Sequence, residues 1–432
     1  MEKFNDVSVF SIIPFVLMLL AIAVLPITSP HFWESNRNKL IIAITLSIPE
    51  IIYIFYVGNE GHLFHTIFFD YIPFIILLGS LFVITGGIHL SGDIEAKPLT
   101  NVFILGIGAV LASFMGTTGA SMLLIRPIIQ INGERKLKVH TILFFIGIVA
   151  NCGGLMTPLG DPPLFMMYLR GAPFFWFLEL FVEWFFVNAM LLLIYFIVDS
   201  YYYKKENPKD ISFDKTNIKP LKIEGKRNFI FLLGVVLSVA FINEHYFPLI
   251  HESEYYRFVR EAVILAMAIL SLLFTPKLLR VSNNFNWHPI EEVAYLFLGI
   301  FITMDSALIY LVKHANELGI TTPTQFYYYT GILSSFLDNT PTAVTLHSLA
   351  EGLNITTGEM VANIPEILLK AISVSAVFFG SMTYIGNGPN FMVKAVAEQS
   401  GIKMPDFISY MIKFSLILLL PLFILAELFF IR

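Results

Sequence analysis

Long runs of apolar residues alternate with short polar segments along almost the whole chain. A helix needs about 20 apolar residues to cross a bilayer, and the pattern predicts ten such crossings. The first run lacks a basic leading segment and a small-residue cleavage site, so we expect a membrane helix there and not a signal peptide. The predicted fold class is an all-α polytopic membrane protein. The crossings are placed at 8–27, 39–57, 66–90, 139–168, 173–198, 228–245, 258–275, 291–312, 366–396 and 405–431.

Two further apolar stretches, 100–131 and 321–350, have small and polar residues at their centres. The first contains Phe114-Met-Gly-Thr-Thr-Gly-Ala-Ser121, and the second contains Ser334-Ser-Phe-Leu-Asp-Asn-Thr-Pro-Thr-Ala343. Such a centre predicts a re-entrant hairpin, in which two half-helices meet at a tip inside the membrane. Non-helical backbone at that depth is tolerated only where it is enclosed by protein or lines a cavity.

Two of the crossings are interrupted by glycine and proline, at 151–166 and 380–392. A helix cannot continue through Pro158, Pro162 and Pro163 without losing backbone hydrogen bonds. The freed carbonyls have no water to bind in a bilayer, so the break is expected to line a cavity or an ion site. The segments 154–166 and 380–392 align without gaps and share seven of thirteen residues. We therefore predict two broken helices of common origin.

The spacing of these features predicts an internal duplication. The hairpin tips lie 222 positions apart and the broken helices lie 226 positions apart. Five crossings per half is an odd number, so the second half is expected to be inverted relative to the first. Paired interrupted segments in two halves indicate the binding site of a secondary transporter. The predicted organisation is a first repeat at 1–198, a linker at 199–227 and a second repeat at 228–432.

Composition and charge support a membrane location. The chain is 56% hydrophobic and 14% charged, whereas soluble domains carry about 25% charged residues. Segment 199–227 contains eight Lys and Arg residues and segment 58–65 contains none. Because cytoplasmic loops are rich in Lys and Arg, we expect the linker to be cytoplasmic. The protein is then expected in the inner membrane with both termini on the side opposite the cytoplasm. A basic linker of this kind is expected to contact anionic lipid and not nucleic acid.

Asp161 is the first candidate for an ion-binding residue. A carboxylate within the membrane costs several kcal/mol unless it is paired or serves an ion path. Here it lies in a helix break, where carbonyl oxygens and the Thr157 hydroxyl supply the hard oxygen ligands that Na⁺ prefers. The alternative is that Asp161 only caps the half-helix that begins at Pro162.

Asp338 and Asn339, at the second hairpin tip, form the other strong candidate pair, with helix capping again as the alternative. We hypothesise that Na⁺ binds at Asp161 and Asp338. Asp305 is a weaker candidate on its own helix, and Arg126 could hold an anionic substrate or neutralise Asp161. The remaining candidates are hydroxyls and amides of the tips and breaks: Thr117, Thr118, Ser121, Asn151, Thr340, Thr342, Thr383, Asn387 and Asn390.

At these motifs the chain resembles the ion transporter superfamily, which includes divalent-anion symporters, citrate transporters, arsenite permeases and NhaD-type sodium/proton antiporters. The resemblance covers nearly the whole chain, because both hairpins and both broken helices occur in order. It implies two inverted repeats, a scaffold domain and a transport domain, a homodimer, and substrate movement by an elevator-like shift.

The motifs leave two substrate classes open. Asn151, Pro158-Leu-Gly-Asp161 and Asp338-Asn339 resemble the sodium/proton antiporters, although the first hairpin lacks the acidic residues of that family. Gly386-Asn-Gly-Pro-Asn390 is similar to the anion symporters. The first hypothesis is therefore a Na⁺/H⁺ antiporter, and the alternative is a Na⁺- or H⁺-coupled citrate or dicarboxylate transporter. An enzyme or structural subunit is disfavoured because no nucleophile or metal-ligand pattern occurs, and only Na⁺ and H⁺, no cofactor, are expected.

Overall fold

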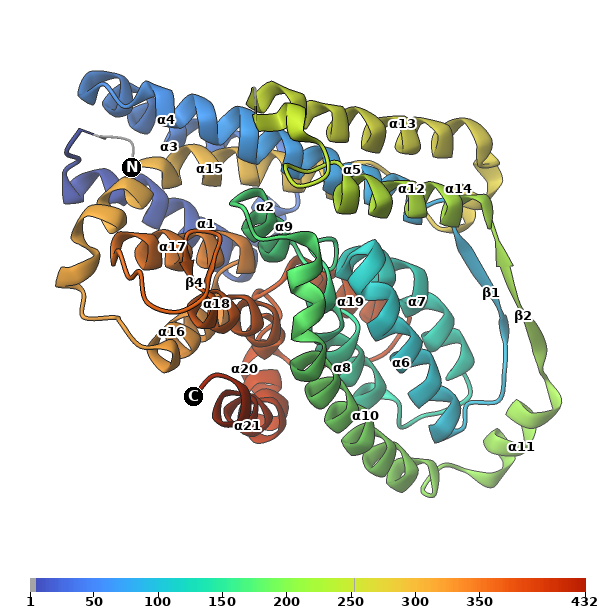
Figure 1. Ribbon diagram of the computed structural model, residues 1–432. Coiled ribbons are helices and arrows are strands. Elements are labelled where there is room, and N and C mark those ends of the chain that lie inside the picture. Colours follow the sequence, from blue (N-terminus) through green and yellow to red (C-terminus); the bar gives the residue numbers. More distant parts are fainter. Residues whose placement is uncertain (1–4, 252) are drawn as a thin grey trace.

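The computed structural model describes residues 5–251 and 253–432. Residues 1–4, with which the first repeat is predicted to begin, lie outside the described residues, as does residue 252. The chain is mostly helical, and its strands form two small antiparallel pairs (Figure 1). One pair joins β1 (His89–Asp93) to β2 (Lys219–Glu224), and the other joins β3 (Met360–Val361) to β4 (Ile364–Pro365).

Among the described residues, eight helices are long and apolar enough to cross a membrane. The protein is therefore an all-α multi-pass membrane protein, as predicted from its sequence. Two of the ten predicted crossings are shorter than expected, because α12 (Arg227–Phe241) has 15 residues and α13 (Phe258–Phe274) has 17. The predicted crossing 66–90 also ends early, since α5 (Ile72–Thr85) stops before β1.

One group of helices occupies the upper part of Figure 1. It contains α1 (Ile13–Thr28), α3 (Asn36–Val57), α5, α12, α13 and α15 (His288–His314). Near the starts of α3 and α15, the Asn36 amide donates to the His288 carbonyl over 2.9 Å. One turn later, Lys39 forms an ion pair with Glu292 over 2.7 Å. The two helices therefore run parallel, with their first turns side by side.

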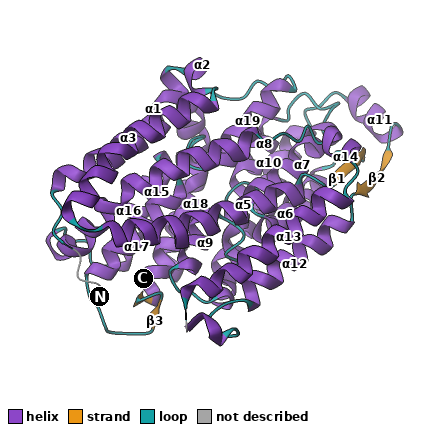
Figure 2. Cartoon of the chain, turned by 90° about the horizontal axis from the view of Figure 1, so that it is seen from above, coloured by secondary structure: helices purple, strands orange, loops and turns teal. Residues whose placement is uncertain are grey.

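The second group contains two helical hairpins and two interrupted helices, and Figure 2 shows them packed in the centre of the molecule. In the first hairpin, α6 (Pro98–Met115) and α7 (Thr117–Ile131) meet at Gly116. In the second, α16 (Pro323–Phe336) and α17 (Asn339–Gly352) meet at Leu337 and Asp338. Each tip has a single turn of non-helical backbone that lets the chain reverse direction.

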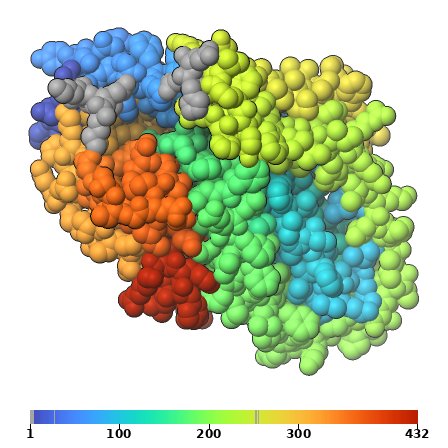
Figure 3. All heavy atoms as spheres, viewed as in Figure 1, coloured from blue at the N-terminus to red at the C-terminus, as the bar shows by residue number. Residues whose placement is uncertain are grey.

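Both interrupted helices change direction at the glycine- and proline-rich segments. The first runs as α8 (Val139–Ile148), a 3-10 segment (Cys152–Met156) and α9 (Pro162–Leu169). The second runs as α18 (Glu366–Phe379), a 3-10 segment (Gly380–Met382) and α19 (Gly388–Gln399). Helix α9 packs against α17 of the second hairpin, and the green and orange surfaces of these regions adjoin in Figure 3. Residues far apart in the sequence thus meet at the breaks.

The remaining elements connect or cover these two groups. The longest is α10 (Phe181–Tyr203), which packs against α6 and α8. Two π-helical segments interrupt otherwise regular helices, at Thr66–Tyr71 and Met411–Leu419. The short helices are α2 (Pro30–Trp33), α4 (Glu60–His65), α11 (Pro208–Thr216), α14 (Lys277–Ser282), α20 (Phe407–Tyr410) and α21 (Leu420–Phe430). The 3-10 segments are Val9–Ile12, Phe174–Leu180, Pro248–His251, Glu254–Arg257 and Ala315–Glu317.

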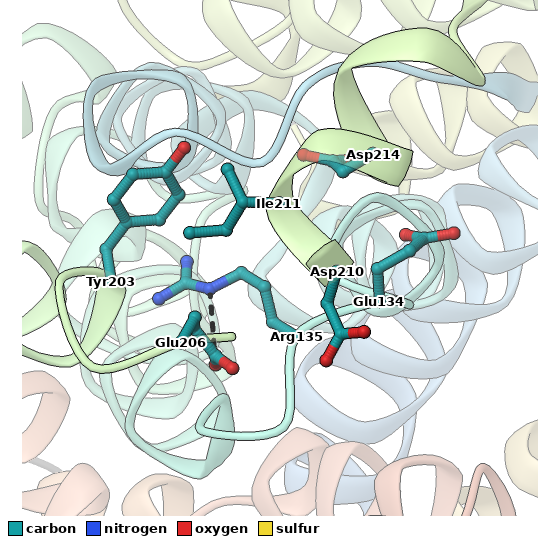
Figure 4. A pocket seen from close by; sticks show the side chains of 7 residues that line it. All are labelled: Glu134, Arg135, Tyr203, Glu206, Asp210, Ile211 and Asp214. Carbon is teal, nitrogen blue, oxygen red and sulfur yellow. Dashed lines mark ion pairs between the residues drawn. The ribbon is translucent and has the colours of Figure 1, made fainter. Parts of the chain in front are cut away.

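The linker 199–227 is folded against the first hairpin. It contains α11 and β2, and β2 pairs with β1 along the right edge of Figure 1. Arg135 and Asp199 are both buried and form an ion pair over 2.5 Å, and His140 contacts the same carboxylate over 2.7 Å. Figure 4 shows the small pocket that Arg135 enters, with Glu206 as its ion-pair partner there. The pocket is lined by Glu134, Arg135, Tyr203, Glu206, Asp210, Ile211 and Asp214.

We expect Asp199→Asn to loosen the linker, because it leaves the buried Arg135 without a full counter-charge. Breaking a buried ion pair costs about 3–5 kcal/mol, so tryptic cleavage within 199–227 should become at least about tenfold faster. Asp210→Asn is the matched control, since its contact with Lys136 is a 3.7 Å pair at the surface. Equal cleavage rates in the two variants would contradict the proposed role of the Arg135–Asp199 pair.

Candidate functional site

The hairpin tips and the helix breaks are joined by backbone and hydroxyl hydrogen bonds. At the first tip, the Thr117 amide donates to the Gly160 carbonyl over 2.8 Å. The Thr157 hydroxyl donates to the Ser113 carbonyl, and the Thr383 hydroxyl donates to the Ser335 carbonyl. A hydroxyl of each break thus satisfies a carbonyl in one hairpin, and the first tip in turn satisfies the Gly160 carbonyl of the first break, as a bilayer interior requires.

The side chain of Asp161 lies at the centre of this region. Its Oδ1 accepts hydrogen bonds from the Thr117 hydroxyl over 2.9 Å and from the Asn387 amide over 3.1 Å. Its Oδ2 accepts from the Asn339 amide over 2.7 Å. These three donors come from the first hairpin, the second break and the second hairpin, and all three are neutral. The carboxylate is 1% exposed, so the site is closed to solvent in this conformation.

A network of asparagine amides surrounds the carboxylate. The Asn151 amide donates to Asn390 Oδ1 over 2.7 Å, and Asn387 donates to Asn151 Oδ1 over 3.2 Å. Asn390 donates in turn to the carbonyls of Gly380 and Thr383 over 2.8 and 2.9 Å. The amides that contact Asp161 present their N–H groups to it, so their oxygens would have to turn toward the carboxylate to serve as the hard ligands that a small cation prefers.

Asp338 forms the helix cap that was the alternative to an ion-binding role. Its Oδ1 accepts from the Thr340 amide over 3.0 Å, and its carbonyl accepts from the Thr342 hydroxyl over 3.0 Å. It therefore caps the first turn of α17, and the adjacent Asn339 contacts Asp161 instead. A shared ion site of the two carboxylates stays a prediction.

The other candidate residues are not all brought to Asp161. Thr118 is half-buried, and the hydroxyls of Ser121 and Thr340 are buried without a hydrogen-bond partner among the described residues. Arg126 donates to the Asn283 carbonyl over 2.9 Å. Asp305 lies on α15, where it contacts His62 and Thr66. Arg126 is thus engaged elsewhere, and Asp305 belongs to a separate cluster.

The sequence reasoning missed Ser113. Its hydroxyl donates to the Gly153 carbonyl over 2.5 Å and accepts from the Met156 amide over 3.3 Å, while its carbonyl binds Thr157. Ser113 lies 222 positions before Ser335, which binds Thr383 in the same way. The hairpin offset could therefore have identified Ser113 as part of the first break.

We expect Asn390→Ala to destabilise the second break, because it removes three buried hydrogen bonds at once. Each unsatisfied buried group costs about 1–3 kcal/mol, so the thermal unfolding temperature in detergent should fall by several degrees. Lys394→Ala on the same helix is the control, since Lys394 forms an i,i+4 surface pair with Glu398. An unfolding temperature equal to that of the control would show that the network adds no stability.

Comparison with known proteins supports membrane transport. A family described as putative citrate transport matches residues 4–431. A "46 kDa membrane protein" of Mycobacterium leprae is 23% identical over 89% of this chain and 92% of its own length. Two proteins titled "Uncharacterized transporter", from Mycobacterium bovis and Mycobacterium tuberculosis, are each 22% identical over 84% of this chain and 87% of their own length. These matches agree with the resemblance to the ion transporter superfamily.

Proposed function

Because this chain belongs to the putative citrate transport family, we propose that it is a secondary active transporter that exchanges Na⁺ for H⁺ at Asp161. Membership of the family supports membrane transport and leaves the substrate to be argued from the site. The observation that carries the cation assignment is the set of partners of Asp161. The three hydrogen-bond donors of this buried carboxylate are a hydroxyl and two amides, none of which carries a positive charge, so a bound cation or proton would be the group that neutralises it.

The helix N-termini at the site favour a cation over a multivalent anion. An anion would bind at free amides of a helix N-terminus. The Thr117 amide of α7 is already bonded to the Gly160 carbonyl, and the N-terminus of α17 is capped by the Asp338 carboxylate. The N-termini of the two hairpin helices are therefore occupied by groups of the protein itself. The N-terminus of α9 directly follows Asp161, whose charge would repel an anion, and that of α19 has no side-chain cap.

Exchange follows if Na⁺ and H⁺ compete for the same carboxylate. In one form, Na⁺ lies against Asp161 and amide oxygens turned toward it. In the other form, a proton occupies the carboxyl group and the Na⁺ is absent. Because only the neutralised site is inexpensive to enclose in a low-dielectric interior, each passage across the membrane carries one cation or the other. Such a cycle requires an intermediate in which the site is enclosed, and the burial of Asp161 supports the proposal in this respect.

The test is the pH response of vesicles to Na⁺. Purified protein is reconstituted into liposomes that contain a fluorescent pH probe, and NaCl is added outside. Entry of Na⁺ in exchange for H⁺ should raise the internal pH, whereas choline chloride should have no effect. Protein-free liposomes measure the leak. If NaCl and choline chloride give the same trace at every pH, the exchange assignment fails.

A second function is favoured by the family description and by Gly386-Asn-Gly-Pro-Asn390. It is a citrate or dicarboxylate carrier in which Asp161 binds the coupling cation and a homodimer, as the resemblance implies, forms the working unit. Uptake of labelled citrate into proteoliposomes with and without a Na⁺ gradient separates the two functions. Uptake that needs the gradient would support the carrier, and absence of uptake together with the pH response would support the exchanger.

A further inference from the structure

Two buried carboxylates lie outside the Asp161 site, in the interface between α3 and α15. Glu50 on α3 is 1% exposed and Asp305 on α15 is 0% exposed. The two parallel helices bring these residues to equivalent depths, since Glu50 lies seven residues before the end of α3 and Asp305 lies nine residues before the end of α15. At 1.5 Å per residue, both are about 10–14 Å inside the same end of the helix pair.

Each carboxylate has one oxygen that is satisfied and one that is not. Asp305 Oδ1 accepts from the Thr66 hydroxyl over 3.0 Å and contacts His62 Nδ1 over 2.6 Å. Glu50 Oε1 accepts from the Ser306 amide over 3.2 Å. Among the described residues, Asp305 Oδ2 and Glu50 Oε2 are buried without a hydrogen-bond partner. A buried unsatisfied oxygen on a carboxylate is costly, and it points to a ligand that the described side chains do not supply.

The surroundings do not provide enough positive charge for two carboxylates. Glu50 and Asp305 are close enough to repel each other electrostatically, and Asp70 adds a further buried negative group near His62. From the α9 side, Arg170 faces this cluster, but it lies 3.7 Å from Glu351 of α17 and also donates to the buried His347 and to Ser348. His65 and Arg257 offset the charge of Asp70, whereas no Lys or Arg of the described residues forms an ion pair with Glu50 or Asp305, so uptake of a proton would relieve the repulsion between these two carboxylates.

We propose that Glu50 and Asp305 form a proton-binding site, separate from Asp161, that exchanges its proton with solvent through His62. The side chain of His62 is 21% exposed while the Asp305 side chain is fully enclosed. His62 also lies two residues after the start of the apolar segment Glu60–Thr85, so it is near the end of that segment, where water is accessible. The π-helical segment Thr66–Tyr71 supplies the Thr66 contact, and π-helical turns are frequent at functional sites. A metal ion fits less well, because no group of three or more His, Cys, Asp and Glu side chains among the described residues is arranged to hold one.

His62 can pass a proton to Asp305 without a change in its own net charge, because it takes up one proton and releases another. Imidazole can accept a proton from water at Nε2 and release the proton of Nδ1 to Asp305 Oδ1, 2.6 Å away. The reverse steps return the proton to water. If the proposed Na⁺/H⁺ exchange is correct, on which this part depends, the site would load the proton that accompanies each cycle. The existence of the proton site itself does not depend on the transported substrate.

Infrared spectroscopy tests the site without a transport assay. The full-length protein in lipid is titrated with pH, and the carbonyl-stretch band of protonated carboxyl groups is followed, with its shift in D₂O. We expect Glu50→Gln and Asp305→Asn each to remove or displace one such band in an Asp161→Asn background. Ser47→Ala is the matched control, because Ser47 lies one turn earlier on α3 and its hydroxyl is also buried without a partner.

The outcomes separate this proposal from the exchange assignment. Loss of a band in either carboxylate variant, with the Ser47→Ala spectrum unchanged, supports the proton site even if liposomes show no Na⁺/H⁺ exchange. Unchanged bands in both carboxylate variants overturn it, even if exchange is observed. The use of two variants keeps the test informative if one of them does not fold. In liposomes, His62→Gln should slow the pH response severalfold, and an unaltered rate would exclude His62 as the route.

Discussion

Asp161→Asn is expected to abolish the Na⁺-driven pH change in liposomes while leaving the protein folded and in the membrane. The asparagine has nearly the same shape, so it can keep contacts with Thr117, Asn339 and Asn387 with reoriented amides. It removes the only charge among these four side chains. Without that charge, a dehydrated cation has no counter-ion in a site closed to solvent, and the loss should reach the background rate.

The control for this variant relocates the charge. Asn387 aligns with Asp161 across the two breaks, and its amide lies 3.1 Å from the Asp161 carboxylate. The double variant Asp161→Asn/Asn387→Asp therefore restores one carboxylate at almost the same point. We expect it to recover part of the exchange, whereas Asn387→Asp alone should be impaired by two like charges in contact. Wild-type exchange in Asp161→Asn would remove the basis of the assignment.

Gly160→Ala is expected to have the largest effect on folding. A Cβ atom at residue 160 would lie 1.9 Å from the Gly154 carbonyl oxygen, and a Cβ at Gly386 would lie 2.6 Å from the Gly380 carbonyl oxygen. The clash is with backbone, which cannot rotate aside as a side chain can. We expect a loss of about 3 kcal/mol or more of stability, seen as reduced monodisperse protein and a lower unfolding temperature in detergent.

The control for this substitution is Gly388→Ala in the second break. A Cβ atom there would meet no atom within 4 Å, so the variant should unfold at the wild-type temperature. Gly386→Ala should fall between the two because its clash is less severe. If Gly160→Ala and Gly388→Ala behaved alike, the close approach of the two backbone segments could not be what shapes the break.

Sequence reasoning identified the elements of the site better than their contacts. Proline and glycine located the breaks, because their effects on a helix are local and strong. The composition of 151–166 placed Asp161 among oxygen ligands, and the structure surrounds it with Thr117, Asn339 and Asn387. The sequence named Asp338 and Asn339 together and could not tell which of the two contacts Asp161, since a shift of one residue at a hairpin tip decides which side chain faces inward and which caps α17.

Other differences have similarly local causes. The crossing 66–90 was predicted too long because Ile88 and Leu90 extend the apolar stretch past Gly86 and Gly87, although the chain there turns into the ribbon with β2. The cluster of Glu50, His62 and Asp305 was invisible as a unit, because its members come from three helices with no shared spacing. The inverted relation of the two halves stays a prediction, to which the paired Ser113–Thr157 and Ser335–Thr383 contacts give support.

The two hairpins each donate a hydrogen bond to a different oxygen of the Asp161 carboxylate, the first through Thr117 and the second through Asn339. Movement of the first hairpin away from Asp161 would break the hydrogen bond from Thr117 and leave the one from Asn339. Movement of the second hairpin would break the Asn339 bond and leave the Thr117 bond. Opening of the site by movement of either hairpin therefore costs one charge-assisted hydrogen bond, roughly 1.5–3 kcal/mol. Movement of both hairpins at once would break both hydrogen bonds. This larger free-energy cost disfavours a state that is open to both sides of the membrane and would let ions leak.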